Sequence, residues 1–215
     1  MLKYRPFEMH CHTRHSDGTF LVPQLIESVA AYGYAGLALT DHNAVTGLLE
    51  VTEELQRKNN CLVLPGIEWT TFYGHLLVIG CDRFVDWRFV TPDTIDEALQ
   101  EIRAAGGIAG VAHPCEVGSP LMCGCNWEFR VKRWDLMDYV EIWSGPDPHA
   151  SAKNGLAMPW YDALLNQGYH LAISAGRDWH GPDKPGQIPL LTATYLGIDG
   201  DVTIENAKAC LLYTS

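Results

Sequence analysis

The chain has 215 residues, of which 47% are hydrophobic and 19% charged, so it has enough apolar side chain to bury a core and too little charge to stay disordered. It carries 15 Lys and Arg against 26 Asp and Glu, a formal net charge of −11, which argues against a protein that binds the phosphate backbone of nucleic acids. No apolar run reaches the roughly 18 residues of a membrane helix, no secretory signal opens the chain, and the 7 cysteines are scattered, which together predict a cytoplasmic protein without a membrane partner.

Short apolar runs rich in branched residues alternate with amphipathic segments, and this alternation predicts β-α units. One helix is expected to begin near Pro23 and another near Thr94, which has capping-box spacing with Glu97. Two further helices are predicted over residues 160–168 and 204–211. The predicted strands are a segment before His10 and residues 37–39, 61–64, 75–80, 108–112, 139–143, 169–174 and 191–196.

Apolar strands separated by helices indicate an α/β fold with a mostly parallel sheet covered by helices. At this length a closed barrel and an open doubly wound sheet both fit, and the periodicity does not choose between them. Residues 116–135 lack a clear period and are expected to form a long loop beside the site. No linker divides the chain, so residues 1–215 are expected to be one domain. The last five residues stop where another element could follow, which suggests a truncated C-terminus.

Histidines and acidic residues gather where the predicted strands end. Side chains at the carboxyl ends of parallel strands converge on one rim, and strand alternation puts His10 and His12 on the same side. Such a gathering leaves like charges close together unless a cation compensates, which predicts a metal centre. His149 and His170 are expected to be ordinary hydrogen-bonded residues. The candidate ligands, with Asp41 adjacent to them, are His10, His12, Asp17, His42, Glu68, His75, His113, Asp178 and His180.

Nine ligands exceed the four of one tetrahedral zinc site and suffice for two or three ions if a carboxylate bridges. Seven motifs that carry them occur in the order of the PHP (polymerase and histidinol phosphatase) family. They are His10-x-His12, Ser16-Asp17-Gly18, Thr40-Asp41-His42-Asn43, Pro65-Gly66-Ile67-Glu68, Gly74-His75, Ala112-His113-Pro114 and Gly176-x-Asp178-x-His180. The chain resembles this family over about residues 5–182, and most of all its stand-alone hydrolase branch. The resemblance implies a distorted (β/α)7 barrel.

The resemblance also implies how the ligands divide. A first ion is expected on His10, His12, Glu68 and Asp178, a second on Glu68, His75 and His113, and a third on Asp17, His42 and His180. Asp41 is expected to orient a neighbouring imidazole. With two or three divalent ions (Zn, Mn or Fe), a bridging hydroxide would attack phosphorus, so the expected activity is a phosphoesterase that acts on a small phosphorylated metabolite.

Some residues depart from the family pattern or have two interpretations. Arg177 and Trp179 stand where the family has small residues, and both are expected near the substrate. Arg177 either binds a phosphate or carboxylate or pairs with a nearby acid. His15 is a candidate to protonate the leaving group, with a hydrogen-bonded or solvated role as the alternative. Ser144 stands where relatives often carry Asn, so a substrate contact is not transferred to it.

Three alternatives stay open. The same centre could hydrolyse a carboxyl ester, a carbamate or an amide. A non-catalytic metal-binding interaction module, like the PHP domains inside some polymerases, is the third functional class. Cys115, Cys123 and Cys125 could hold a structural zinc ion, but no fourth ligand has a recognised spacing, which favours free thiols.

Overall fold

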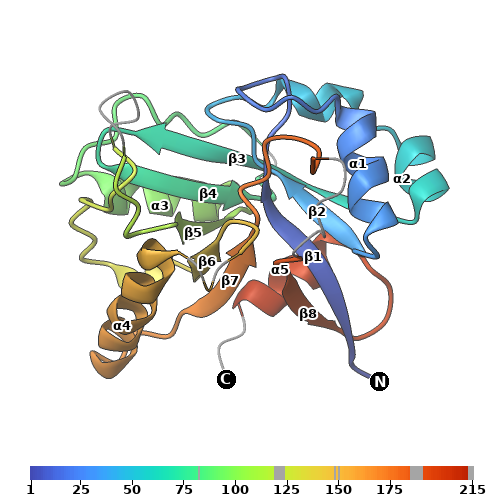
Figure 1. Cartoon of the computed structure of the whole chain (residues 1–215). Helices are drawn as coiled ribbons and strands as arrows, with labels where there is room; N and C mark the ends of the chain where they lie inside the picture. Colours follow the sequence, from blue (N-terminus) through green and yellow to red (C-terminus); the bar gives the residue numbers. More distant parts are fainter. Residues whose placement is uncertain (82, 119–123, 148, 150, 185–190, 213–215) are drawn as a thin grey trace.

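The computed structural model describes residues 1–81, 83–118, 124–147, 149, 151–184 and 191–212. Within these ranges eight strands form one sheet in the order β7-β6-β5-β4-β3-β2-β1-β8 (Figure 1). The strands are β1 (Lys3–Cys11), β2 (Gly36–Leu39), β3 (Leu62–Thr71), β4 (Gly74–Ile79), β5 (Ile108–Ala112), β6 (Tyr139–Ser144), β7 (Ala172–Gly176) and β8 (Thr194–Ile198). Each predicted strand is present, and β3 continues well beyond its predicted end.

A seam between β1 and β7 curls the sheet into a nearly closed barrel. Beyond the end of β7, Trp179 N donates to His10 O (3.0 Å) and His12 N donates to Trp179 O (3.0 Å). Deeper in the seam, Glu8 Oε1 accepts hydrogen bonds from His10 N (3.0 Å) and Arg177 N (2.9 Å). The carboxyl group of Glu8 thus links the backbones of the two strands where direct backbone hydrogen bonds would otherwise join them. The expected distorted barrel is confirmed, with eight strands in the sheet.

The sheet is less parallel than expected, because β4 and β8 run against their neighbours. Strands β1, β2 and β3 pair in parallel, as do β5, β6 and β7. β4 is antiparallel to β3 and β5, and β8 is antiparallel to β1. A two-residue turn at residues 72–73 joins β3 to β4, and so short a connection forces antiparallel pairing. Consequently the first residues of β4 lie at the rim where the parallel strands end.

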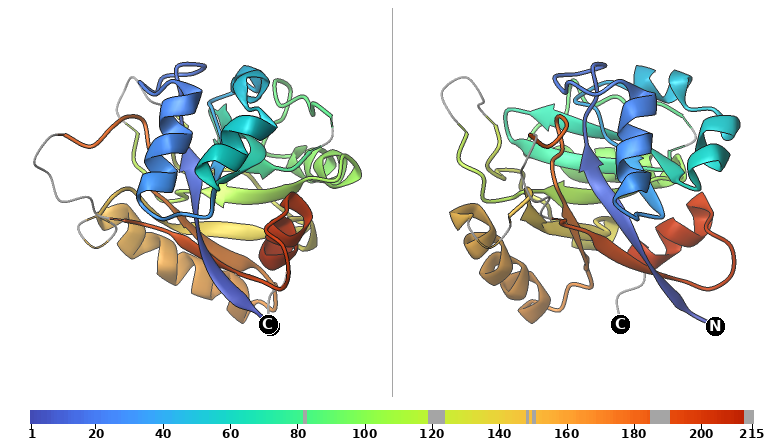
Figure 2. Two further views of the ribbon diagram at one scale, coloured as in Figure 1. Left: turned by 90° about the vertical axis from the view of Figure 1, so that its right-hand side faces the viewer. Right: turned by 45° about the vertical axis from the view of Figure 1, so that its right-hand side comes forward.

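The helices pack outside the strands, with α1 and α2 on one side of the barrel and α4 on another (Figure 2). In α1, Pro23 lies in the first turn, and Leu25, Ile26 and Val29 are buried, as expected. Within the described residues, no helix combines the length and apolar character needed to cross a bilayer. The helices are α1 (Val22–Ala31), η1 (Thr46–Glu50), α2 (Glu53–Asn59), α3 (Ile95–Ala104), η2 (Trp134–Leu136), α4 (Ala152–Asn166) and α5 (Ile204–Leu212), where η marks 3₁₀ turns.

Helix boundaries differ from expectation in two places. The capping box predicted at Thr94 is wrong, since its hydroxyl accepts a hydrogen bond from Thr91 N (2.9 Å) and makes no cap bond to the helix. Helix α4 begins at Ala152, well before the predicted start, and continues through Pro159. Helix α2, which buries no residue, lies outside the predicted elements.

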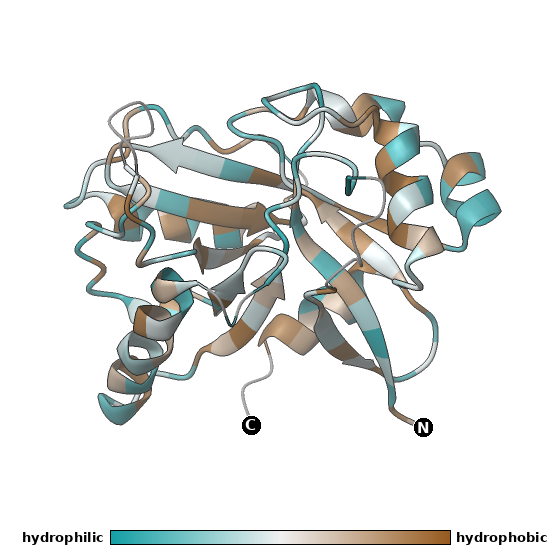
Figure 3. Cartoon of the chain, viewed as in Figure 1, coloured by the Kyte–Doolittle hydropathy of each residue, from teal (hydrophilic) through white to brown (hydrophobic). Residues whose placement is uncertain are grey.

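The barrel interior is apolar at one end and polar at the other. Leu64 on β3 and Leu77 on β4 belong to an interior cluster that the α5 residues Ala207 and Leu211 complete. Side chains alternate along a strand, so residues further along the same face of these strands rise from this cluster toward the rim. Figure 3 shows hydrophobic residues along β4 and β7, a mixture of hydrophilic and hydrophobic residues along β1, and α2 as largely hydrophilic. The apolar layer thus supports whatever side chains occupy the rim.

Candidate metal centre

All nine predicted ligand residues lie at the rim where the parallel strands end. His10 lies on β1 and Glu68 on β3. His75 is the second residue of β4 and reaches the same rim because that strand is antiparallel. The remaining six lie in the segments that follow β1, β2, β5 and β7, namely His12, Asp17, His42, His113, Asp178 and His180. The topology therefore brings together residues separated by up to 170 positions.

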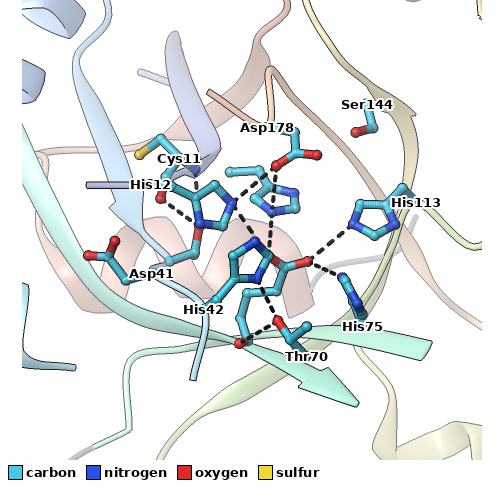
Figure 4. A network of polar contacts seen from close by, with 12 residues as sticks. Cys11, His12, Asp41, His42, Thr70, His75, His113, Ser144 and Asp178 are labelled. Atoms are coloured by element: carbon cyan, nitrogen blue, oxygen red, sulfur yellow. Dashed lines mark hydrogen bonds and ion pairs between the residues drawn. The ribbon is translucent and has the colours of Figure 1, made fainter. Parts of the chain in front are cut away.

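The carboxylate of Glu68 is fully buried, and its two oxygens face different imidazoles. Figure 4 shows three of these imidazoles, those of His42, His75 and His113, turned toward one another. Oε1 lies 2.9 Å from His75 Nδ1 and 3.1 Å from His113 Nε2. Oε2 lies 3.1 Å from His10 Nε2 and 2.9 Å from His42 Nδ1. One carboxylate thus joins two sets of imidazoles, as a bridging ligand does.

Two aspartates complete the cluster. Asp178 Oδ1 lies 3.1 Å from His12 Nε2 and 3.4 Å from His10 Nε2. Asp17 Oδ1 lies 3.2 Å from His180 Nε2 and 3.6 Å from His42 Nε2. Each of the three ligand groups that the family resemblance implies is therefore brought together in space. Their occupation by metal stays a prediction.

The distances within the cluster suit metal ligands. Two ligands at 2.0–2.1 Å from a tetrahedral zinc ion lie about 3.3 Å apart, and the facing nitrogen and oxygen atoms of this cluster lie 2.9–3.6 Å apart. Among the described residues, His10 Nε2 and Glu68 Oε2 are buried and lack a hydrogen-bond partner, although they lie 3.1 Å from each other. Because unsatisfied buried polar atoms are costly, a cation between them would be stabilising. The residues fit a metal centre.

Glu141 on β6 supports the cluster from behind and is absent from the predicted set. Its Oε1 lies 3.0 Å from His10 Nδ1, and its Oε2 accepts a hydrogen bond from His113 N (3.1 Å). A carboxylate facing Nδ1 holds the proton on that nitrogen, which leaves Nε2 of His10 free to coordinate. His180 is oriented similarly, since its Nδ1 lies 2.8 Å from Asp178 O. Glu141 therefore plays the part that the resemblance gave to Asp41.

Burial and opposing charges shift the pKa values of the cluster. Burial raises the pKa of the Glu68 carboxyl group, but the imidazoles of His10, His113 and His42 outweigh it and hold this pKa well below its usual range. Burial lowers the pKa of His10, and the carboxylates of Glu141 and Glu68 reverse the effect and raise this pKa well above its usual value. Protons and divalent cations would compete for the same atoms, because a coordinating imidazole must be neutral.

The backbone around the cluster adopts conformations that favour glycine. Asn43, His113 and Asp178 have positive φ values of 51°, 25° and 51°. Such φ values are uncommon outside glycine and gather at functional sites, where the surrounding structure enforces them. Gly176 has a different purpose, since a Cβ there would lie 2.5 Å from the Cβ of His10. The close approach of β7 to β1 thus requires glycine.

The expected role of Asp41 as an imidazole partner is wrong. Its Oδ1 accepts hydrogen bonds from Thr13 N (2.6 Å) and Ser16 Oγ (2.8 Å), and its Oδ2 accepts one from Thr13 Oγ1 (2.7 Å). Figure 4 shows Asp41 at the edge of the cluster. Asp41 therefore shapes the loop that carries Asp17. His15 does not face the cluster either, since its Nε2 lies 2.8 Å from Glu50 Oε1.

Arg177 and Trp179 are both buried. Only 3% of Arg177 is exposed, and its guanidinium forms a two-pronged ion pair with Asp183 at 2.5 and 3.2 Å. It also lies 4.0 Å from the ring centroid of Trp179, which packs edge-on against Phe20 in the core. Of the two interpretations of Arg177, the geometry supports pairing with an acid. The expected place of Trp179 near the substrate stays a prediction, and only 4% of this residue is exposed.

His149 and His170 are exposed and belong to no candidate ligand group of the described residues, in agreement with their predicted exclusion. Cys123 lies outside the described residues. The candidate groups found in the described part of the chain contain no cysteine. Three side chains that the prediction omitted do lie around the cluster: Thr70, whose Oγ1 is 2.5 Å from His42 Nδ1, and Glu116 and Lys153, which pair with each other.

The chain is similar to a known protein family and, over part of its length, to a characterised relative. Residues 8–109 match the family model described as PHP domain. A stretch of 79 residues is 34% identical to part of the 3',5'-nucleoside bisphosphate phosphatase of Chromobacterium violaceum. That match covers 35% of this chain and 27% of the relative, so the shared part is about a quarter of that protein's length.

Solved structures show the same fold at low sequence identity. A two-domain protein from Bacteroides vulgatus that contains a predicted PHP-like metal-dependent phosphoesterase aligns with a TM-score of 0.72 at 16% identity, over 98% of this chain and 63% of that one. An amidohydrolase from Chromobacterium violaceum, with bound sulfate and no metal, aligns with a TM-score of 0.56 at 19% identity, over 86% of this chain and 90% of that one. At these identities the likeness establishes the fold alone.

Proposed function

We propose that residues 1–215 form one hydrolase domain that acts as a metal-dependent phosphoesterase on a small phosphorylated metabolite, because residues 8–109 match the PHP domain model. The observation that carries the proposal is the cluster around Glu68, in which one buried carboxylate faces five imidazoles from four different segments. Relatives named as a bisphosphate phosphatase and as a PHP-like phosphoesterase support the same substrate class.

Two or three divalent ions, Zn, Mn or Fe, would occupy the cluster. His10, His12, Glu68 and Asp178 would hold the first, Glu68, His75 and His113 the second, and Asp17, His42 and His180 the third. When bound, such ions acidify a water molecule toward neutral pH and offset charge on phosphoryl oxygens. We propose this division because, within each set, facing nitrogen and oxygen atoms lie 2.9–3.6 Å apart.

The protein's own residues prepare the site in three ways. Glu141 fixes the orientation of His10, and the Asp178 carbonyl fixes that of His180. Asp41 holds the loop of Thr13 and Ser16 and thereby the backbone that leads to Asp17. The apolar layer beneath the rim excludes water from the floor of the site, where charged interactions are stronger than in bulk solvent.

A substrate panel tests the proposal. The protein, loaded in turn with Mn²⁺ and Zn²⁺, is offered nitrophenyl phosphate monoesters and diesters beside nitrophenyl carboxyl esters. We expect turnover of a phosphate ester. Turnover of carboxyl esters alone would reject the phosphoesterase in favour of a carbonyl hydrolase, and stable metal binding without any turnover would favour a non-catalytic module.

Two histidine variants test the assignment of the cluster. We expect His10→Ala to lose at least one bound metal ion and its hydrolytic activity, because His10 faces both Glu68 and Asp178. His149→Ala serves as the matched control, since His149 is exposed and outside the ligand groups. Elemental analysis and initial rates measure both. Equal metal content and equal rates in the two variants would contradict the assignment.

A further inference from the structure

A lysine lies beside the cluster without a part in holding metal. Lys153, in the first turn of α4, has a side chain that is only 20% exposed. Its Nζ pairs with Glu116 and lies 3.4 Å from Ser144 Oγ. An ammonium group is repelled by a bound cation and cannot coordinate it, because it has no lone pair. Lys153 therefore needs an explanation other than metal binding.

Asn154 fixes where Lys153 stands. Its Oδ1 accepts a hydrogen bond from Ser144 N (3.0 Å), and its Nδ2 donates to Ser144 O (3.0 Å). These two bonds tie the beginning of α4 to the end of β6, and both residues are buried, with exposures of 4% and 1%. Figure 4 shows Ser144 on the side of the cluster where His113 lies. The lysine is thus held near the rim by buried structure and is not a freely moving surface residue.

Glu116 connects Lys153 to the cluster. Its Oε2, which pairs with Lys153, lies 3.7 Å from His113 Nδ1. Glu116, His113 and Asp178 each offer a polar atom, and these atoms lie within 4.8 Å of one another. The ammonium group is therefore one ion pair away from residues proposed as metal ligands.

We propose that Lys153 binds a non-bridging phosphoryl oxygen of the substrate, with the Ser144 hydroxyl beside it; this inference rests on the proposed function. Before the substrate binds, Glu116 holds the ammonium group in place, and the phosphoryl oxygen then takes the place of the Glu116 carboxylate. A phosphate monoester carries two negative charges, and a lysine is a common partner for such a group. Arg177, the other candidate for this role, pairs with Asp183. No bond to carbon or phosphorus changes in this exchange, which swaps one ion pair for another.

Binding of inorganic phosphate to the metal-loaded protein tests this role without relying on turnover. Isothermal titration calorimetry with phosphate is done on the wild-type protein, Lys153→Met, Lys153→Arg and the control Lys58→Met. Lys58 is exposed and pairs with Glu27. We expect Lys153→Met to bind phosphate about 10- to 100-fold more weakly, as for the loss of a charged hydrogen bond. Lys153→Arg should recover part of the affinity, and Lys58→Met should match the wild-type protein.

Metal content separates this role from a structural one. Elemental analysis should find the same metal content in Lys153→Met as in the wild-type protein. Glu116→Gln should keep its metal and bind phosphate more tightly, because Lys153 loses its competing partner. Equal phosphate affinity in Lys153→Met and the wild-type protein, or no phosphate binding at all, would overturn the inference. Metal loss in Glu116→Gln would overturn it too, since Glu116 would then serve the metal.

The kinetic readout distinguishes this inference from the proposed function. For a nitrophenyl phosphate, Lys153→Met should raise KM more than it lowers kcat, while turnover of any neutral carboxyl ester stays as in the wild-type protein. A wild-type protein that hydrolyses no phosphate ester would refute the proposed function, and the phosphate titration would still decide the role of Lys153. Normal phosphoesterase kinetics in Lys153→Met would refute the inference alone.

Discussion

Glu141 controls the orientation of His10 and offers the sharpest test among single residues. Its carboxylate lies 3.0 Å from His10 Nδ1 and also accepts the backbone N–H of His113. Replacement by Ala would free the ring and leave that N–H unpaired. Partners of this kind contribute about 10- to 100-fold in metal affinity or activity. We expect a loss of that size in Glu141→Ala, measured by competition with a chelating dye, and a smaller loss in Glu141→Gln.

The exposed Glu97 on α3 provides the control for this change. Glu97→Ala should bind metal as the wild-type protein does. An unchanged metal affinity in Glu141→Ala would mean that His10 is held by packing alone.

Sequence patterns identify the nine rim residues, but they name Asp41 instead of Glu141 as the carboxylate that orients an imidazole. Asp41 is adjacent to His42 in the chain, and adjacency suggested contact. In the fold its carboxylate turns to Thr13 and Ser16 instead. Glu141 meets His10 across the barrel, 131 positions away in the chain, and no local pattern encodes that contact. The sequence does show Glu141 as a charged residue inside an apolar strand, but Glu8 has the same pattern and a different role, so the pattern alone does not identify Glu141.

Glu8 makes stability depend on pH. Burial raises its pKa from 4.5 to about 8, although N–H groups of Arg177 and His10 lower it. Between these two values the folded protein holds a proton that the unfolded chain releases, so stability is fully present below 4.5 and falls as pH rises toward 8. The slope is about 1.4 kcal/mol per pH unit. We expect Glu8→Gln, which keeps an acceptor oxygen in the seam, to lose this decline.

Urea unfolding of the wild-type protein and Glu8→Gln from pH 5 to pH 8, with chelator present, measures the difference. The free energies of unfolding should diverge as pH rises, in favour of the variant. Parallel profiles would show that the carboxyl group titrates normally.

The seam between β1 and β7 depends on Gly176. A methyl group there would lie 2.5 Å from the Cβ of His10 and 2.9 Å from Glu141 Oε1, so the strand would have to move outward. Overpacking of this kind costs about 1–3 kcal/mol. We expect Gly176→Ala to lower the free energy of unfolding by this amount and to weaken metal binding as well, because the moved strand leads to Asp178 and His180.

Gly155 in α4 is the matched control, because nothing lies within 4 Å of its added methyl group and Ala favours a helix. Gly155→Ala should be neutral or slightly stabilising in the same urea titration. Equal stability of the two variants would argue against a tight seam.

Strand positions could be predicted from apolar runs, whereas strand direction could not. Residues 75–80 read as one more buried strand, and an apolar run looks the same in either direction. The two-residue turn at residues 72–73 sets the antiparallel direction of β4. That direction brings His75, at the start of the strand, to the same rim as side chains at the ends of others. The capping box at Thr94 could not be excluded from spacing alone, because the backbone N–H of Thr91 donates to the Thr94 hydroxyl that the cap would need.

At the scale of the whole molecule, the rim concentrates carboxylates in a protein whose net charge is already −11. Divalent cations would offset part of this charge where it is densest. Without the cations, protons supply the compensating positive charge. Burial lowers the pKa values of His10, His42 and His113, but nearby carboxylates outweigh it and raise them. Burial raises the pKa values of Glu68 and Asp178, but the facing imidazoles outweigh it and lower them. Protonation and metal binding therefore stabilise the same fold in different pH ranges.

The sign of each shift defines those ranges. A raised histidine pKa stabilises the fold fully below 6.5, and this stabilisation is lost as pH rises through the folded-state value. A lowered carboxyl pKa stabilises the fold above 4.5 for Glu68 and 3.8 for Asp178, and this stabilisation is lost as pH falls through the folded-state values. The stabilisation that these histidines and carboxylates give the chelated protein should therefore be greatest between about pH 4.5 and 6.5, where imidazolium and carboxylate groups coexist.

Metal removal should thus matter most at alkaline pH. There fewer protons compete with the ions for the imidazoles, so the bound ions contribute more of their binding free energy to folding. We expect a chelator to lower the Tm by several degrees at pH 8 and by much less at pH 5.5, measured by differential scanning calorimetry of matched samples with and without the chelator. His149→Ala should show the same pattern as the wild-type protein. A chelator effect of equal size at both pH values would mean that protons do not compete with metal at the rim. The imidazoles around Glu68 would then not be metal ligands.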